Sequence, residues 1–244
     1  MVTAAALATL ALCGPALAGA GTASATTLSA AYAQHSAAGG TWGKPIEVPG
    51  MATINTGGNA YLDAVSCPSA GNCAAAGQYS DTAKHGQALV LSEVNGTWGT
   101  ARELPGTGAL NTGGDAYVNS LACASAGNCS AGGFYTDSSA HQQVFVASEV
   151  NGAWRPAIEV PGTSTLNKGA AQILALSCGS AGNCVAGGDY TDGSGRQQAF
   201  VVSQVNGAWG TASELAGTAK LNTNNAQVTS VSCPAPGNCT AGGY

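Results

Sequence analysis

The chain has 244 residues, a net charge of −5 and only 8% charged residues. Its 7 Lys and Arg residues are scattered singly, so no surface is expected to neutralise a phosphate backbone, and nucleic acid is excluded as a partner. Apolar residues make up 45% of the chain, but much of this share is alanine, which buries little area. Such a chain needs a repetitive architecture or covalent staples to offset its backbone entropy.

Residues 1–25 are predicted to be a secretory signal peptide. An apolar N-terminal stretch is followed by the small residues Ala23–Ala25, which suit cleavage. No Lys or Arg precedes this stretch, and Cys13 is an alternative site for a lipid anchor, although Leu12 is large for that purpose. We therefore expect a secreted, extracellular protein with no membrane association after cleavage, in which residues 26–39 form a leader with a possible degenerate strand.

Cysteine and tryptophan recur in phase along the chain. The cysteine pairs are Cys67/Cys73, Cys123/Cys129, Cys178/Cys184 and Cys233/Cys239, each with the spacing C-x5-C. The tryptophans are Trp42, Trp98, Trp154 and Trp209. Both sets repeat every 55 or 56 residues, a period that suits the four-stranded blade of a β-propeller. The tryptophans are predicted to pack between blades, with sugar stacking as the alternative.

Each C-x5-C pair is predicted to form a local disulfide. Export implies an oxidising compartment, and two antiparallel strands joined by a short turn bring opposed Cα atoms within disulfide range. The alternative of a zinc site would need reduced thiols and lacks the usual C-x2-C knuckle. The spacing also differs from that of a catalytic dithiol.

The copy from Ala60 to Pro105 shows how one unit is built. Strands are expected at residues 61–66, 73–79, 87–94 and 97–104. Asn95-Gly96 is a strong hairpin signal between the last two strands. The predicted fold is therefore all-β, a small β-propeller of about four four-stranded blades, each with a hairpin disulfide.

The repeats are predicted to fill residues 40–244. Successive blades are expected at about 40–104, 105–160, 161–215 and 216–244. The last copy holds only the first two strands, whereas the N-terminal part holds a fourth strand and a possible third. These strands are expected to complete the last blade and close a ring. The alternative is an open fragment of a larger propeller.

The motif S-C-P-S-A-G-N-C-x-A-x-G-x-Y-[ST]-D, followed by an apolar strand and N-G-x-W, resembles repeat regions of exported actinobacterial proteins. It is also similar to the blade repeats of kelch and sialidase-like propellers. The resemblance covers residues 40–244 and implies a propeller and secretion, without implying an activity. The Asp-box of sialidases, S-x-D-x-G-x-x-W, is not reproduced.

The connections between second and third strands share one face of a propeller, and this face usually binds ligands. Here each carries an Asp followed by a basic residue. The candidate ligand-binding residues are Asp81, His85, Asp137, His141, Asp192 and Arg196. One interpretation is that each Asp hydrogen-bonds its own turn. The other is a quasi-symmetric polar ring that binds glycans or wall polymers; one Asp per loop is too few to predict a Ca²⁺ site, so no metal or cofactor is expected.

No catalytic residues are predicted. Glu47, Glu103, Glu159 and Glu214 recur at one repeat position, and a carboxylate present in every unit indicates a structural role. Asp63, Asp115 and Asp189 are not repeated, but the sequence does not pair them. The expected function is a non-catalytic binding or scaffold propeller for an extracellular glycan, wall polymer or protein. The alternatives are a sialidase-like hydrolase that acts on glycans and a spacer region of a larger surface protein.

Overall fold

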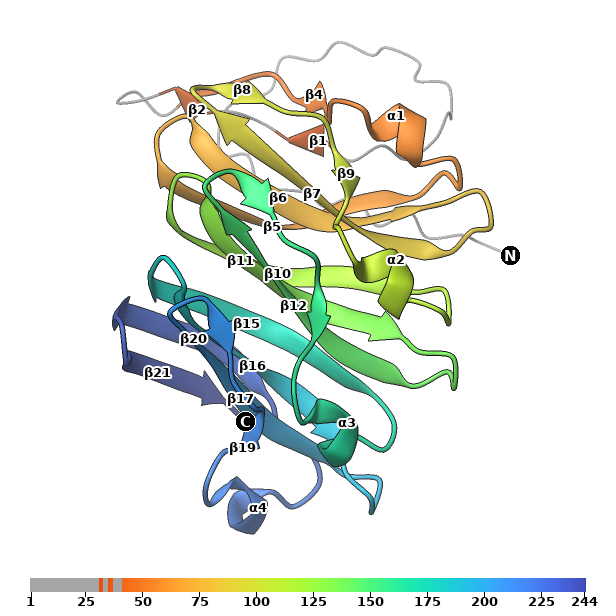
Figure 1. Ribbon diagram of the computed structural model, residues 1–244, viewed down its shortest axis with the longest axis vertical. Helices are drawn as coiled ribbons and strands as arrows, with labels where there is room; N and C mark the ends of the chain where they lie inside the picture. The colour runs from red at the N-terminus through yellow and green to blue at the C-terminus, as the bar shows by residue number, and fades with distance from the viewer. Residues whose placement is uncertain (1–30, 33–34, 37–40) are drawn as a thin grey trace.

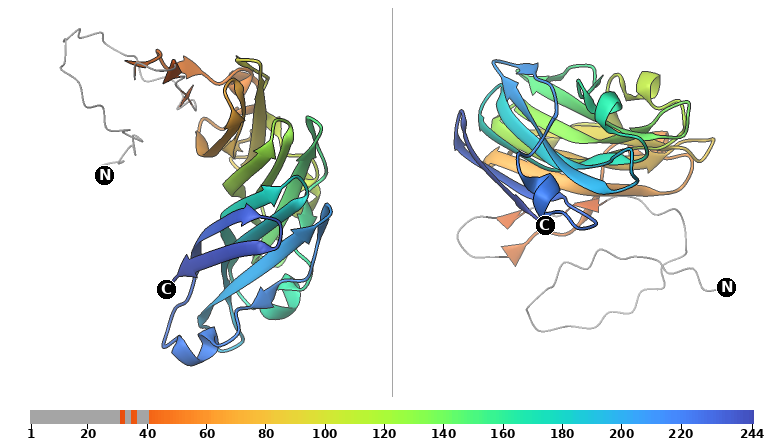
Figure 2. Two further views of the ribbon diagram at one scale, coloured as in Figure 1. Left: turned by 90° about the vertical axis from the view of Figure 1, so that its left-hand side faces the viewer. Right: turned by 90° about the horizontal axis from the view of Figure 1, so that it is seen from below.

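The computed structural model describes residues 31–32, 35–36 and 41–244. The predicted signal peptide, with Cys13, lies outside the described residues, and its cleavage stays a prediction. The described chain is all-β apart from four one-turn helices, and its sheets stack along a curved arc (Figures 1 and 2). The predicted fold class, built from repeated four-stranded units, is confirmed.

Three complete blades share one strand order, in which consecutive antiparallel strands are neighbours. The first blade contains β5 (Ala60–Ser69), β6 (Asn72–Ser80), β7 (Gly86–Val94), β8 (Thr97–Trp98) and β9 (Arg102–Glu103). The second contains β10 (Ala116–Ser125), β11 (Asn128–Thr136), β12 (Gln142–Val150), β13 (Ala153–Trp154) and β14 (Ile158–Glu159). The third contains β15 (Ala171–Ser180), β16 (Asn183–Thr191), β17 (Gln197–Val205), β18 (Ala208–Trp209) and β19 (Ser213–Glu214).

The expected fourth strand is split into two short segments in every complete blade. In the first blade, β8 and β9 both pair with β7, and residues 99–101 separate them. The hairpin before β8 turns at Asn95 and Gly96, whose φ angles of 51° and 79° suit a tight turn between strands. The predicted hairpin is therefore present, and the strand after it is interrupted.

Four one-turn helices occupy the segments between blades. They are α1 (Met51–Ile54), α2 (Thr107–Leu110), α3 (Thr163–Leu166) and α4 (Thr218–Leu221). Each follows a glycine with positive φ, such as Gly106 at 85°. Four residues are too few to display a helical hydrophobic period, so the sequence pattern does not reveal these helices. In the structure, the Thr107 hydroxyl donates to the Leu104 carbonyl at 2.7 Å and fixes the start of the helix.

Each first hairpin is closed by a disulfide, as predicted. The bonds are Cys67–Cys73, Cys123–Cys129, Cys178–Cys184 and Cys233–Cys239, with Cα–Cα distances of 3.9 to 4.1 Å. The turn inside the first disulfide docks on the neighbouring hairpin of the same blade. Asn72 Oδ1 accepts from the Asn95 N–H at 3.3 Å, and the Gly71 carbonyl accepts from the Gly96 N–H at 2.8 Å.

Successive blades pack face to face through their apolar side chains. Trp154 of the second blade lies in one core cluster with Val90 and Leu104 of the first blade. Trp209 of the third blade packs on a core cluster that contains Val144 of the second. Trp154 and Trp209 therefore have the blade-packing role that the repeat predicted, whereas Trp42 is 54% exposed.

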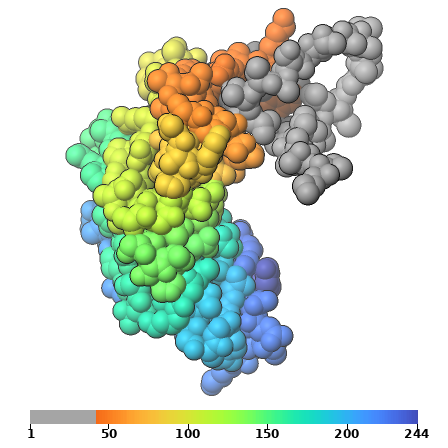
Figure 3. Space-filling view, turned by 90° about the vertical axis from the view of Figure 1, so that its right-hand side faces the viewer, coloured from red at the N-terminus to blue at the C-terminus, as the bar shows by residue number. Residues whose placement is uncertain are grey.

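Each end of the arc carries half a blade. The N-terminal half-blade consists of β1 (Ala31–Tyr32), β2 (His35–Ser36), β3 (Thr41–Trp42) and β4 (Ile46–Glu47). The C-terminal half-blade consists of β20 (Val228–Ala235) and β21 (Asn238–Gly243). The two half-blades lie at opposite ends of the stack, separated by the complete blades (Figures 1 and 3). Closure of a ring within one chain therefore stays a prediction.

Replacing both Cys123 and Cys129 with alanine is expected to lower the free energy of unfolding by about 2 kcal/mol, because the short loop is no longer closed in the unfolded chain. Urea denaturation followed by tryptophan fluorescence measures this loss. The matched control replaces Cys233 and Cys239, which close the hairpin of the C-terminal half-blade and should affect the complete blades less. Equal losses from the two replacements would contradict the expectation.

Candidate functional site

The loops between second and third strands lie along the side of the arc that also carries α1–α3 (Figure 1). Each loop is organised around its own aspartate. Asp137 Oδ1 accepts from the backbone N–H groups of Ser139 at 2.8 Å and His141 at 3.0 Å, and Oδ2 accepts from Gln143 Nε2 at 3.2 Å. Asp81 and Asp192 accept the equivalent hydrogen bonds in their own blades.

These hydrogen bonds stabilise the charged form of each aspartate. Burial alone would raise the pKa of Asp137, but the hydrogen bonds from His141, Gln143 and Ser139 outweigh it and hold that pKa below its ordinary value. The pKa of Asp192 is also lowered, chiefly by hydrogen bonds from the side chains of Ser194 and Gln198. The aspartates therefore serve as anionic anchors for their loops.

The basic residue of each loop lies beside its aspartate and remains about half exposed. His85 Nδ1 is 3.9 Å from Asp81 Oδ2, and His141 Nδ1 is 3.9 Å from Asp137 Oδ2. Arg196 Nε is 3.5 Å from Asp192 Oδ2. The structure thus brings the six candidate residues together as three separate pairs, one on each complete blade. Their binding role stays a prediction, and their role in shaping the loops is visible in the contacts.

A second polar group of side chains, the inner-strand cluster, consists of Tyr61, Asp63, Asp115 and Tyr117. It lies where β5 of the first blade meets the start of β10 in the second. Tyr117 Oη donates to Asp115 Oδ1 at 3.3 Å. Burial raises the pKa of Tyr117, and the nearby charges of Asp115 and Asp63 raise it further. Tyr61 is 41% exposed, so the cluster presents an aromatic side chain and carboxylates to solvent.

Two neighbours shape the inner-strand cluster. The Phe134 ring lies 4.8 Å from the Tyr117 ring between centroids and fixes its orientation. Gly86 lies against the Tyr117 hydroxyl, where an added Cβ would stand 3.0 Å from Oη. Gln142 and Gln197 occupy the position of Gly86 in the other blades, so this small residue leaves room at the cluster of the first blade only.

The third blade has a different arrangement at the corresponding place. Asp189 is only 3% exposed and accepts hydrogen bonds from Gln172 Nε2 at 3.3 Å and Gln197 Nε2 at 2.7 Å. Burial raises its pKa, although both glutamine amides act in the opposite direction. The structure therefore places Asp63 and Asp115 near one tyrosine and gives Asp189 separate partners. The sequence signal for this difference is that Tyr61 and Tyr117 are replaced by glutamine in the later copies.

The repeated glutamates hold the outer strand segments. Tyr79 Oη donates to Glu103 Oε2 at 3.5 Å, and Tyr135 Oη donates to Glu159 Oε2 at 2.8 Å. Tyr190 makes the same bond to Glu214 at 3.1 Å. Burial and the adjacent charge of Glu103 raise the pKa of Tyr79 to about 12. This is the structural role predicted for glutamates at this repeat position.

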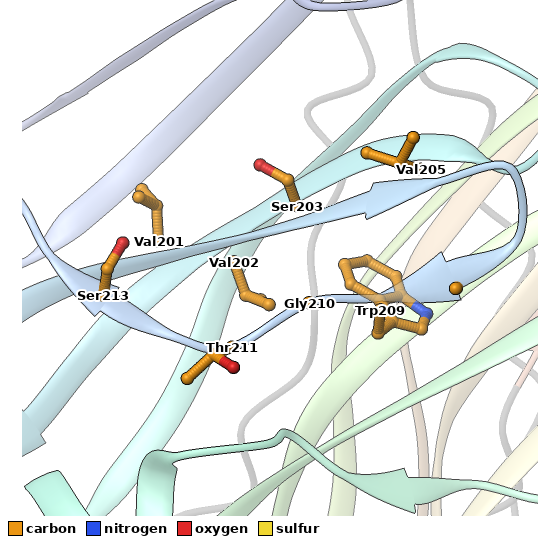
Figure 4. A pocket seen from close by; sticks show the side chains of 9 residues that line it. Val201, Val202, Ser203, Val205, Trp209, Gly210, Thr211 and Ser213 are labelled. Carbon is orange, nitrogen blue, oxygen red and sulfur yellow. The ribbon is translucent and has the colours of Figure 1, made fainter.

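Two shallow hollows lie at the outer side of the blades. One, of about 310 Å³, is lined by third-blade residues that include Ser203, Trp209 and Thr211 (Figure 4). The other, of about 330 Å³, is lined by Ser92 of the first blade and Trp154 of the second, among others. They occupy equivalent positions in the repeat, between the third strand and the break in the fourth.

Within residues 41–244 and the short strands before them, no three His, Cys, Asp or Glu side chains gather as they would around a metal ion. None of the described helices has the length and apolar character needed to cross a membrane. No protein-family model matches the chain, and a search of curated proteins found no match either.

Replacing Tyr135 with phenylalanine is expected to lower the free energy of unfolding by about 1–2 kcal/mol, because Glu159 loses a short hydrogen bond to its carboxylate. Tyr79→Phe is the matched control, since its bond to Glu103 is longer, at 3.5 Å. Chemical denaturation of both variants measures the difference. A loss from Tyr79→Phe as large as that from Tyr135→Phe would contradict the structural role assigned here.

Asp137→Asn is expected to destabilise the protein at neutral pH and to differ less from the parent as the pH falls below about 4. The pKa of Asp137 is lower in the folded protein than in the unfolded chain, so the charged carboxylate stabilises the fold at pH values above the unfolded pKa. This stability is lost as the pH falls through the pKa of the folded protein. Thermal unfolding measured between pH 7 and pH 3 tests this expectation.

Glu149→Gln provides a control, because the pKa of Glu149 is shifted in the opposite direction to that of Asp137. Burial raises the pKa of Glu149, although a hydrogen bond from Ser92 and the charge of Arg102 oppose the increase. The stability linked to this raised pKa is present below the unfolded pKa and is lost as the pH rises. A difference between Asp137→Asn and the parent that stays constant with pH would contradict the assignment.

Proposed function

We propose that this protein is secreted and binds an extracellular glycan, such as a wall polymer, as a non-catalytic module. The inner-strand cluster is the observation that supports this proposal. Tyrosine rings offer an apolar face to the C–H groups of a sugar ring, while their hydroxyls remain available for hydrogen bonds. Asp63 and Asp115 add acceptors for sugar hydroxyls beside Tyr117.

Charge narrows the class of ligand. The chain has a net charge of −5, and the carboxylates of Asp63 and Asp115 contribute negative charge at the cluster. Anionic polymers would be repelled, so neutral or amine-bearing sugars fit this surface better. The disulfides support an extracellular location because such bonds persist in oxidising compartments.

The repeated loops suit the same role. Each complete blade places one half-exposed basic side chain beside an aspartate, in the order His85, His141 and Arg196 along the arc. A polymer with a regular repeat could contact several blades at once. Such contacts add avidity without requiring a strong site on any single blade.

Retention on insoluble neutral polysaccharides tests the proposal. Tyr61→Ala and Tyr117→Ala are each expected to weaken binding at least tenfold, which corresponds to about 1.4 kcal/mol. Leu221→Ala is the matched control, because Leu221 is 84% exposed but lies on α4. If no polysaccharide retains the parent protein, or if the tyrosine variants bind as the control does, the proposal is wrong.

A hydrolase that acts on glycans is the second candidate, and one observation favours it. Asp63 and Asp115 both lie near Tyr117, and glycosidases use two carboxylates in one site. Desolvation raises the pKa of Asp63 although the residue remains exposed, as suits a proton donor. Release of reducing ends from a bound polysaccharide, abolished by Asp63→Asn, would replace the binding proposal with this one.

A further inference from the structure

The N-terminal half-blade reproduces the register of the outer half of a complete blade. Its strands pair Ala31 with Glu47 and His35 with Trp42. The corresponding pairs in the complete blades are Leu89/Glu103 and Glu93/Trp98, Phe145/Glu159 and Glu149/Trp154, and Phe200/Glu214 and Gln204/Trp209. The half-blade therefore supplies third-strand and fourth-strand segments.

The C-terminal half-blade supplies the complementary inner strands. In each complete blade the second strand pairs with the third over most of its length. Among the described strands, β21 pairs only with β20, and all of its residues are exposed. Cysteines at the position of Cys239 are buried in the complete second and third blades, where Cys129 and Cys184 are 5% and 2% exposed. The outer edge of β21 can therefore accept a third strand.

The hollow of the third blade matches the exposed tryptophan of the N-terminal half-blade. In the first blade, the equivalent hollow is bounded by Trp154 of the next blade, which is 6% exposed. The third-blade hollow is lined by third-blade residues alone, with Ser203 and Thr211 on its wall (Figure 4). Trp42, the equivalent of Trp154, is 54% exposed. One end of the arc thus presents the side chain that the other end lacks.

Hydrogen bonds between successive blades give a second indication that the two ends of the arc fit each other. Ser92 Oγ donates to Glu149 Oε1 of the next blade at 2.7 Å, and Ser148 Oγ accepts from Gln204 Nε2 of the next blade at 2.9 Å. Ser203 occupies the same position in the third blade and lines its hollow. The register of the N-terminal half-blade puts His35 opposite Trp42. By its place in the repeat, His35 corresponds to Glu149 and Gln204 of the complete blades, and histidine can donate to a hydroxyl or accept from one.

We propose that two copies of this chain join head to tail, so that the N-terminal half-blade of each completes the C-terminal half-blade of the other. β1 and β2 of one copy pair with β21 of its partner, and Trp42 enters the partner's third-blade hollow. The two half-blades of one chain lie at opposite ends of the arc (Figures 1 and 3), which favours a second copy over closure within the chain. Two identical contacts close the assembly, and the outer edge of each β21 gains a paired strand.

Cysteine cross-linking between copies tests the proposed pairing. Val90 pairs with Ala76 in the first blade, and the equivalent positions in the half-blades are Tyr32 and Gly242. An added Cβ at Gly242 meets no atom within 4 Å, so a side chain fits there. Tyr32→Cys and Gly242→Cys are introduced into separate copies that carry tags of different size, and the copies are mixed, refolded and oxidised. A reducible product that contains both tags is expected.

Two outcomes of this experiment would overturn the proposal. One is the absence of the mixed product. The other concerns a double variant that carries both Tyr32→Cys and Gly242→Cys. If this variant forms a cross-link within single chains while the mixed copies form no cross-link, the ring closes within one chain. The matched control pairs Tyr32→Cys with Val94→Cys, an exposed position on the first blade that should give no product.

Light scattering provides a readout that does not depend on new cysteines. The parent chain, of 23.6 kDa, is expected to elute with twice the mass of one copy at micromolar concentration. Trp42→Ala should give a single-copy mass with an unchanged circular dichroism spectrum, whereas Val150→Ala, at an exposed position on the second blade, should keep the doubled mass. A parent protein that stays a single copy, or a Trp42→Ala variant that stays doubled, contradicts the proposed seating of the tryptophan.

Discussion

The turn of each first hairpin docks on the turn of the second hairpin in the same blade, and the rest of the blade depends on this contact. Gly71 and Asn72 accept the backbone N–H groups of Gly96 and Asn95, which would otherwise point out of a tight turn. The disulfide holds the first turn in the shape that makes this contact possible. The hairpins β5–β6 and β7–β8 thus fix each other's position, and their adjacent strands β6 and β7 pair at the centre of the sheet.

Small residues then allow the sheets to be built and stacked. The glycine two residues before the repeated tyrosine faces a β-bulge of the inner strand: a side chain at Gly133 would collide with the Tyr117 carbonyl. Tyr117 also lies beside Asp63, Tyr61 and Gly86 of the preceding blade. The bulge that requires glycine in the motif therefore also positions a residue of the candidate site.

The repeat, the disulfides and the Asn-Gly turn could all be predicted, because each depends on residues that are close together in the chain. The split of the fourth strand at residues 99–101 could not, since it depends on how the next blade packs. Tyr61 and Tyr117 lie close together only because two inner strands from successive blades are adjacent, and no single copy contains that information. The aspartate loops could also be interpreted from the sequence, because hydrogen bonds from an aspartate to its own turn are local, and the structure shows these bonds.

Local disulfides also simplify maturation. Eight cysteines can be joined in 105 ways, and most of those ways would link different blades. Here each of the eight cysteines of the repeats bonds to the one 6 positions away in sequence. A hairpin can therefore be oxidised before the rest of the chain has folded, and the correct partner is always the nearest of these thiols in the sequence. Such a chain can gain or lose whole units without creating a new problem of thiol pairing.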